Sequence, residues 1–240
     1  MDKKAKLWDE KSKTFPRYSD ALNSVQISTF KACDELGIEF GGKNIIDIGC
    51  GTGVWTLHLA QKARAVTALD ASPGMLEVQK EDAARLNLHN IRFINAKFED
   101  YYANLSEKFE LAFASMSPAL NKDSDYEAFM RLAPLRVYLG WEEYRQSDLL
   151  EPLFRAFEAR QRCFDDNDME NFLKKNAIKH EKRVFSEVRV NEKPREIAIE
   201  NAMWHLNMAG VEPSVDELKA FIKDEIITET IKSKIKLLVF

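Results

Sequence analysis

Short apolar runs alternate with amphipathic stretches along most of the chain. Each run has the length of a buried strand, and each intervening stretch has the spacing of a helix. The strands are predicted over 44–48, 65–69, 91–94, 111–115 and 136–141. The helices are predicted over 54–63, 73–86, 125–133 and 147–160. Strands that alternate with helices indicate an α/β fold, with a parallel sheet covered by helices on both faces.

The C-terminal part has a different pattern. Residues 182–190 alternate apolar and polar side chains, and residues 234–240 form an apolar run, so the two segments can pair as an antiparallel edge. Two helices are predicted between these strands, over 196–208 and 215–227.

Two helical segments therefore accompany the predicted sheet. Residues 1–43 are interpreted as an N-terminal helical segment, and residues 191–233 as a helical lid inserted before the last strand. The sequence contains no repeat, low-complexity tract or Pro/Gly/Ser linker, so residues 1–240 are predicted to form one domain.

Composition and charge narrow the class of protein. The chain has 240 residues, of which 45% are hydrophobic, and a net charge of -4, so no nucleic acid partner is expected. A charged N-terminus without an apolar core predicts no signal peptide, and no apolar run approaches the roughly 20 residues that span a bilayer. The cysteines and histidines are scattered, which predicts no metal site. A cytoplasmic protein is expected.

The stretch IDIGCGTG, residues 46–53, carries the strongest chemical signal. Gly49, Gly51 and Gly53 follow the first predicted strand, where they allow a sharp turn and a close approach to a ligand. The helix that follows offers unpaired N–H groups, which suit a carboxylate or a phosphate. Cys50 lies between the glycines and is interpreted as a small residue, not as a reactive thiol.

Two ligand classes compete for this loop. A dinucleotide site has the spacing G-x-G-x-x-G, but the third glycine of that pattern would fall at Val54. The observed G-x-G-x-G follows Asp47, which can attract an amino group. Asp70 ends the second strand and can accept hydrogen bonds from both hydroxyls of a ribose. Met75 can lie against an adenine ring. A ligand with an amine, a carboxylate and a nucleoside, such as S-adenosylmethionine, uses all of these features.

With these motifs, residues 44–120 resemble a class I S-adenosylmethionine-dependent methyltransferase. IDIGCGTG is similar to the first motif of the family, VTALDASPGML to the second, FINAKFEDY to the adenine-contacting motif and FELAFASMSPAL to the fourth-strand motif. The resemblance implies a Rossmann-like doubly wound sheet, mostly parallel, with an antiparallel last strand. It also implies a cofactor site that includes Asp47, Gly49, Cys50, Gly51, Gly53, Asp70, Ala71, Met75, Phe98, Glu99, Ser115 and Met116.

The sequence departs from the family pattern after the third strand. The family often has an acid and a small residue there, to hold the amino group of adenine, whereas this chain has Lys97 and Phe98. A lysine cannot accept that hydrogen bond. Either Glu99 substitutes for the acid, or the backbone makes the contact and Phe98 stacks on the ring.

The fourth-strand motif bears on the methyl acceptor. Similar enzymes that methylate planar amino groups carry Asn-Pro-Pro-Tyr there, whereas this chain has Met-Ser-Pro-Ala-Leu from Met116 onward. The missing amide and aromatic side chains argue against a planar amino acceptor and leave Ser117 as a candidate substrate contact.

Further candidates lie outside these motifs. The resemblance implies an N-terminal helix that closes over the cofactor, with Trp8 near the substrate and Tyr18 near the methionyl carboxylate, unless Tyr18 only packs. Trp141, Tyr144 and Trp204 are further candidate substrate contacts. His205 is a candidate general base if the insertion caps the site, although a lone histidine on a helix is more often structural.

The sequence therefore predicts methyl transfer from S-adenosylmethionine to a small molecule in a lidded pocket. Three alternatives stay open: a methyltransferase that acts on protein or RNA, an NAD-dependent oxidoreductase, and a non-catalytic module that binds an adenosyl ligand. The sequence leaves open the acceptor, the methylated atom and the oligomeric state.

Overall fold

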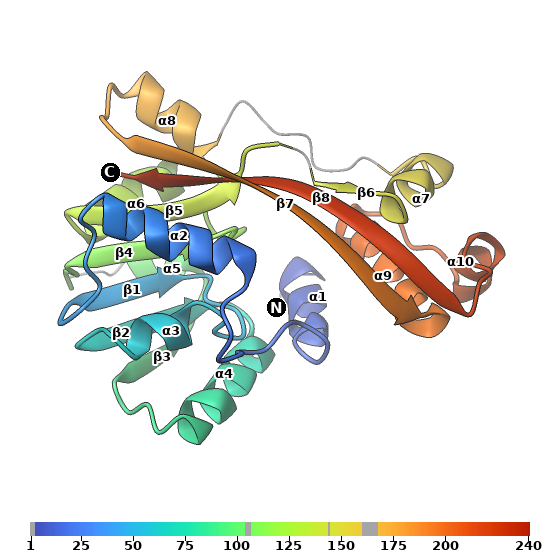
Figure 1. Ribbon diagram of the computed structural model, residues 1–240, viewed down its shortest axis with the longest axis horizontal. Coiled ribbons are helices and arrows are strands. Elements are labelled where there is room, and N and C mark those ends of the chain that lie inside the picture. Colours follow the sequence, from blue (N-terminus) through green and yellow to red (C-terminus); the bar gives the residue numbers. More distant parts are fainter. Residues whose placement is uncertain (1–2, 104–106, 144, 160–167) are drawn as a thin grey trace. The chain divides into compact units, whose positions relative to one another are not determined.

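A computed structural model describes residues 3–103, 107–143, 145–159 and 168–240 of the protein (Figure 1). The helices are α1 (Lys3–Lys11), α2 (Ser24–Glu35), α3 (Thr56–Ala60), α4 (Pro73–Arg85), α5 (Phe98–Ala103), α6 (Asp123–Leu132), α7 (Leu150–Ala156), α8 (Met169–Lys175), α9 (Arg195–Met208) and α10 (Val215–Phe221). The strands are β1 (Asn44–Ile48), β2 (Ala65–Asp70), β3 (Ile91–Asn95), β4 (Leu111–Ser115), β5 (Leu135–Trp141), β6 (Gln146–Ser147), β7 (Glu181–Pro194) and β8 (Ile226–Val239).

The strands form one sheet in the order β3-β2-β1-β4-β5-β8-β6, and β7 pairs with β8 outside this path. Strands β1 to β5 are parallel to one another. Strand β8 is antiparallel to β6. It is also antiparallel to β5, because Arg136 and Phe240 exchange two backbone hydrogen bonds of 2.9 and 3.2 Å. The predicted α/β class, the mostly parallel sheet and the antiparallel last strand are confirmed.

The order of the strands reverses between β1 and β4. From β1 the chain first builds outward to β2 and β3, and it then returns to place β4 on the other side of β1. In an open α/β sheet, ligands bind at the carboxyl ends of the strands on either side of such a reversal. The glycine-rich loop follows β1, so the fold places it at this position.

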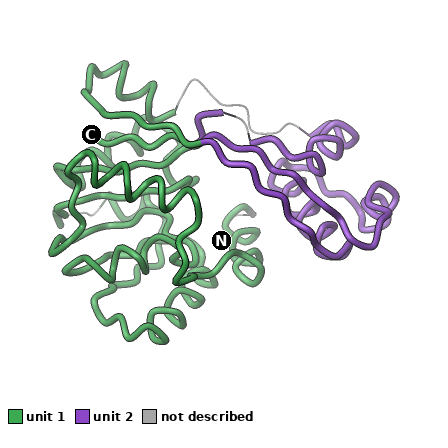
Figure 2. Tube along the Cα trace, in the orientation of Figure 1, with its two compact units in different colours: residues 1–140, 166–185, 235–240 green, residues 141–165, 186–234 purple. Residues whose placement is uncertain are grey.

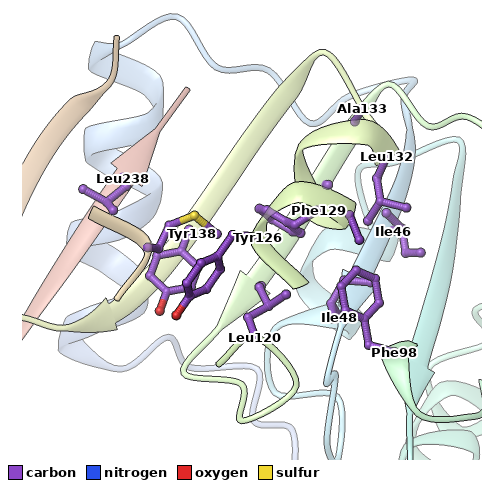
Figure 3. Close-up of a cluster of buried hydrophobic side chains, with 14 of the residues drawn as sticks. Ile46, Ile48, Phe98, Leu120, Tyr126, Phe129, Leu132, Ala133, Tyr138 and Leu238 are labelled. Atoms are coloured by element: carbon purple, nitrogen blue, oxygen red, sulfur yellow. The ribbon is translucent and has the colours of Figure 1, made fainter. Parts of the chain in front are cut away.

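Successive side chains of the central strands point to opposite faces of the sheet, and both faces are covered by other apolar side chains. Ile46 and Ile48 of β1 pack with Phe98 of α5 and Phe129 of α6 in an apolar cluster (Figure 3). Residues of β4, β8 and α8 complete this cluster. On the opposite face, Phe113 of β4 lies 5.4 Å from the Trp55 ring just before α3. Helices α2 and α3 lie in front of the sheet in Figure 1.

Some predicted boundaries were wrong. The helix predicted over 54–63 is shorter, Thr56–Ala60, and the helix predicted over 215–227 ends at Phe221 because β8 begins at Ile226. The buried face of β8 includes two polar side chains, Glu229 and Ser233. The sequence of this strand therefore lacks the alternation of apolar and polar residues that predicts a strand. Helices α5 and α8 and the two-residue strand β6 were not predicted.

The chain divides into two compact units (Figure 2). Unit 1 comprises residues 1–140, 166–185 and 235–240, and unit 2 comprises residues 141–165 and 186–234. Unit 2 has its own apolar cluster, in which α7, α9 and α10 contribute side chains such as Leu153, Ala202 and Leu218. The interpretation of residues 1–240 as a single domain with a lid over 191–233 stays a prediction.

Candidate functional site

The loop after β1 has a backbone that only glycine adopts easily. Gly49, Gly51 and Gly53 have φ angles of 67°, 56° and 86°, in the left-handed region. A Cβ atom on Gly49 would lie 1.9 Å from the Oγ atom of Ser117, which follows β4. The absence of a side chain at Gly49 therefore lets the carboxyl ends of β1 and β4 come together, and it brings two predicted site residues into contact.

Asp70 connects this loop to the end of β2. Its Oδ2 atom accepts a hydrogen bond of 2.8 Å from the Gly51 N–H, and its Oδ1 atom accepts one of 2.8 Å from the Ser72 N–H. Burial raises the pKa of Asp70, while backbone N–H groups of Ser72, Gly51 and Ala71 act in the opposite direction. An ionised carboxylate can accept about four hydrogen bonds, so this half-buried group retains capacity for ligand hydroxyls.

Asp47 lies in β1 beneath the loop and is 2% exposed. The Thr56 hydroxyl donates a hydrogen bond of 2.6 Å to its Oδ2 atom. Burial nevertheless raises the pKa of Asp47 to about 7. A cationic group near this carboxyl would lower the pKa and would be bound in return, as the proposed interaction with a ligand amine requires.

Other predicted cofactor residues lie around these three groups. Burial raises the pKa of the Cys50 thiol well above its usual range, so this thiol is protonated and unreactive at neutral pH. Met75 is 2% exposed in the first turn of α4, and Ala71 is half-buried. Met116, directly after β4, has a φ of 49°, which is unusual for a residue with a side chain. Ser115 ends β4 and is half-buried.

The residues after β3 have other partners. Phe98 is 3% exposed and lies in the apolar cluster shown in Figure 3, with its ring centroid 5.0 Å from that of Tyr102. Glu99 accepts a hydrogen bond of 3.3 Å from Lys122 at the surface. The two predicted ways of holding adenine, through Glu99 or through Phe98, both stay predictions.

The N-terminal segment contacts the glycine loop. The rings of Trp8 and Phe15 meet edge to face at 6.0 Å. A ring carbon of Phe15 lies 4.0 Å from the position of a Cβ on Gly51, and the Thr52 hydroxyl donates a hydrogen bond of 2.5 Å to the Pro16 carbonyl. The structure thus brings Trp8 and its aromatic partner to the loop.

Tyr18 lies farther along, against α3. Its hydroxyl accepts a hydrogen bond of 2.7 Å from Gln61, and its ring lies 4.6 Å from the ring of His58. Tyr18 is also part of an apolar cluster with Leu57 and Ala83. These contacts engage Tyr18 in packing, and its predicted role at the methionyl carboxylate is not tested by them.

Sequence reasoning missed the residues that join the N-terminus to α4. Asp9 accepts hydrogen bonds from the Ser72 hydroxyl, at 2.9 Å, and from the Gly74 N–H, at 2.7 Å. The signal for this contact was present in the sequence Ser-Pro-Gly, because a glycine inside the first turn of a helix weakens the helix unless another element approaches closely there.

The remaining candidates lie in unit 2 or outside the described residues. The rings of Trp204 and His205 on α9 meet at 4.9 Å, and Trp141 is half-buried at the end of β5. Tyr144 lies outside the described residues. The roles of Trp141, Tyr144 and Trp204 in acceptor binding, and of His205 as a general base, stay predictions.

Within residues 3–103, 107–143, 145–159 and 168–240, His, Cys, Asp and Glu side chains form no group of three or more that could hold a metal ion. Over the same residues, every helix is too short or too polar to cross a membrane.

Comparisons with known proteins agree with this geometry. Residues 45–134 match a family model described as a methyltransferase domain. The chain is 32% identical over 78 residues to a probable cobalt-precorrin-6B C(15)-methyltransferase (decarboxylating) from Methanocaldococcus jannaschii, covering 32% of this chain and 42% of that protein. It is 32% identical over 93 residues to a 23S rRNA (uracil(1939)-C(5))-methyltransferase from Francisella tularensis subsp. novicida, covering 39% of this chain and 19% of that protein. The chain thus spans less than half the length of either curated relative.

Solved structures support the fold. A candidate methyltransferase from Bacillus halodurans C-125 superposes with a TM-score of 0.55 at 12% identity, over 88% of this chain and 97% of the other. A precorrin-6y C5,15-methyltransferase from Geobacter metallireducens GS-15 superposes with a TM-score of 0.51 at 12% identity, over 94% and 95% of the two chains. At these identities the likeness concerns the fold alone.

Proposed function

We propose that the chain, whose residues 45–134 match a methyltransferase domain, is a class I S-adenosylmethionine-dependent methyltransferase that transfers a methyl group from this cofactor to a small-molecule acceptor. The observation that carries the proposal is the joined pair of strand ends: the Gly51 N–H is hydrogen-bonded to Asp70 at 2.8 Å, directly at the reversal of the strand order. This hydrogen bond places the glycine loop after β1 next to the carboxylate that we assign to nucleoside binding.

The residues present fit this cofactor. A Cβ atom on Gly51 would lie 4.0 Å from a Phe15 ring carbon, an ordinary contact with a side chain, so no backbone atom of the described residues crowds the loop at Gly51. Asp70 can accept hydrogen bonds from ribose hydroxyls, and Asp47 can attract an amino group. We assign these two acids, the loop glycines and the buried Met75 to the cofactor site.

The chemical demands on the protein are modest. When bound, S-adenosylmethionine supplies a methyl group already activated by its sulfonium. The protein has to bind and orient the acceptor and to exclude water. Aromatic side chains suit the surroundings of a cation, and Trp8 and Phe15 lie beside the loop.

The acceptor class rests on two observations. The sequence after β4, Met-Ser-Pro-Ala-Leu, lacks the amide and aromatic groups that hold planar amino substrates, and the net charge of -4 does not favour a nucleic acid. The curated relative from Methanocaldococcus jannaschii is named for a precorrin, a small molecule. The relative from Francisella tularensis is named for ribosomal RNA, which keeps an RNA acceptor as the second candidate.

Calorimetric titration with S-adenosylmethionine, S-adenosylhomocysteine and NAD tests the cofactor. We expect micromolar binding of both adenosyl ligands and none of NAD. Asp70→Ala should weaken that binding by about 1–3 kcal/mol, because hydrogen bonds between the carboxylate and the ribose are lost. Asp100→Ala removes an exposed acid of α5 and serves as the control. Binding of NAD alone would overturn the proposal in favour of an oxidoreductase.

Incubation with radiolabelled S-adenosylmethionine then tests the acceptor. Label should pass to the small-molecule fraction of a metabolite extract, and transfer to RNA or protein instead would support the second candidate. Cofactor binding without transfer to any fraction would identify a non-catalytic adenosyl-binding module. The cytoplasmic location and the lid over 191–233 stay predictions.

A further inference from the structure

The start of α4 is held by a side chain from α1, a helix more than sixty residues earlier in the chain. The Asp9 Oδ1 atom accepts hydrogen bonds from the Ser72 hydroxyl at 2.9 Å and from the Gly74 N–H at 2.7 Å. The Ser12 hydroxyl in turn donates a hydrogen bond of 2.7 Å to the Asp9 carbonyl, which fixes the end of α1. Figure 1 shows α1 next to α4 in unit 1.

Gly74 permits this contact. A Cβ atom at Gly74 would lie 2.6 Å from the Ser12 Oγ atom, 2.9 Å from the Asp9 Oδ1 atom and 3.3 Å from the Asp9 carbonyl oxygen. A glycine inside a helix costs about 1 kcal/mol relative to alanine. The close approach of α1 therefore offsets a local weakness of α4.

The same contact reaches the proposed cofactor site through Ser72. The Ser72 N–H donates to Asp70, and Asp70 also accepts from the Gly51 N–H. Asp9 thus holds the residue that orients the carboxylate proposed to bind ribose.

The segment after α1 is fixed at a second point. The Arg17 side chain donates to both carboxylate oxygens of Asp82 in α4, at 2.9 and 3.1 Å. Between the two anchors, Pro16 accepts the hydrogen bond from Thr52, and Phe15 lies against Gly51. Residues 9–17 therefore form a strap that is attached to α4 at both ends and crosses the glycine loop.

We propose that Asp9 is a positioning residue for the cofactor, which acts through Ser72 and the start of α4. This inference rests on the proposed function. Asp9 orients the ribose-binding carboxylate and holds Trp8 and Phe15 over the loop, so its contribution shows in the affinity for an adenosyl ligand more than in the stability of the fold.

Substitutions at Asp9 test the inference, with the dissociation constant of S-adenosylhomocysteine and the Tm of the unliganded protein as measurements. Asp9→Ala should weaken binding about tenfold, the loss expected for a hydrogen bond that involves a charged group. Asp9→Asn should retain most of the affinity, because its amide oxygen can accept both hydrogen bonds. Glu10→Ala removes an exposed acid from the same helix and should bind as the wild type does.

Gly74→Ala provides an independent test, because its effect on affinity should differ between the wild type and the Asp9→Ala variant. In the wild type the new methyl group displaces Asp9 and Ser12, so affinity should fall about as far as in Asp9→Ala. In the Asp9→Ala background affinity should not fall again, because the contact that Gly74 permits is already lost, although the Ser12 hydroxyl, 2.6 Å from the new Cβ atom, still has to turn aside.

Three outcomes would overturn the inference: equal affinity of Asp9→Ala and Glu10→Ala, a lower Tm of Asp9→Ala at unchanged affinity, or additive losses in the double variant. Failure of the wild type itself to bind S-adenosylhomocysteine is a distinct result, which overturns the proposed function on which the inference rests.

Discussion

The buried carboxyl group of Asp47 lowers the stability of the unliganded protein at neutral pH. Its pKa is 3.8 without burial and about 7 in the folded chain, because burial disfavours the charged form. Between these two pH values the folded state keeps a proton that the unfolded state has lost, so this group makes the protein less stable as the pH rises.

Asp47→Asn should therefore raise the free energy of unfolding at pH 8 by about 1–3 kcal/mol and, at the same time, weaken binding of S-adenosylmethionine. Urea unfolding at pH 4 and pH 8, with calorimetric titration at pH 8, checks both effects. The gain in stability should be absent at pH 4, and an equal gain at both pH values would contradict a titrating Asp47.

Gln79 is a second residue whose burial has a cost. Its side chain on α4 is 0% exposed, and neither of its polar atoms has a hydrogen-bond partner among the described residues. Gln79→Met keeps the shape and removes the unpaired groups, so the free energy of unfolding should rise by about 1–2 kcal/mol. The matched control is Gln26→Met, which removes hydrogen bonds to Asn23 and Val54 and should lower stability. A lower stability of Gln79→Met would indicate that its amide has partners in solution.

At the scale of elements, the turn from β1 to α3 needs glycine for two reasons: a positive φ angle and a close neighbouring side chain. Glycine substitutions can separate the two. Gly49 has a φ of 67° and also faces the Ser117 side chain, whereas Gly42 has a φ of 69° with no atom within 4 Å of an added Cβ. Gly49→Ala should lower the free energy of unfolding by about 2–4 kcal/mol and weaken cofactor binding, and Gly42→Ala should cost about 1 kcal/mol without an effect on binding. Gly41→Ala, which has open space and no positive φ, is the neutral reference. Equal losses at Gly49 and Gly42 would show that Ser117 moves aside.

The elements that the sequence predicted well are those whose side chains follow one simple pattern. The strands β1 to β5 are apolar runs, and the Ser72–Pro73 start of α4 is a standard N-terminal cap, so both were found. The first half of β8 was missed: residues 226–227 were assigned to a helix and residues 228–233 to the lid, because Glu229 is fully buried there, where Lys193 and Ser147 pair with it at 2.6 and 2.5 Å. Such a polar pairing across strands leaves no periodic signal.

The candidate site divides in the same way. Asp47, Asp70 and the glycines could be predicted because backbone geometry and strand ends fix their positions. The contact of Asp9 with Ser72 and Gly74 could not, because it depends on how a helix distant in sequence packs.

At the scale of the whole molecule, a second buried acid, Glu170, changes stability with pH in the direction opposite to that of Asp47. Burial alone would raise the pKa of Glu170, but hydrogen bonds from Lys174 and Lys182, together with the charge of Lys236, lower it to about 2. Because the unfolded state takes up a proton near pH 4.5, this group contributes stability above that pH and loses it as the pH falls toward 2. The two acids together favour maximal stability of the unliganded protein near pH 4–5, judged from their folded and unfolded pKa values.

Glu170→Gln should accordingly lower the free energy of unfolding by about 2–3 kcal/mol at pH 7, with the difference disappearing near pH 2. Chemical unfolding across this pH range measures the difference. Glu127→Gln, on the neighbouring helix α6, is the control at an exposed acid and should unfold as the wild type does. A loss in Glu170→Gln that does not change with pH would assign the effect to packing and not to charge.

The Arg195 N–H donates a hydrogen bond of 2.9 Å to the Glu225 carbonyl. This bond bears on whether the segment between β7 and β8 can be replaced by a segment from another protein. It closes the segment between β7 and β8 at its base, so the two ends of this segment are fixed next to each other whatever lies between them. A segment with adjacent ends can be lengthened, shortened or replaced at a small entropic cost, as the weak dependence of loop closure on length implies. Residues 196–224 therefore form a segment that can be exchanged as a whole, and a replacement has to cover the apolar side chains of α7, its flanking residues Leu149 and Phe157, and Ile227 of β8.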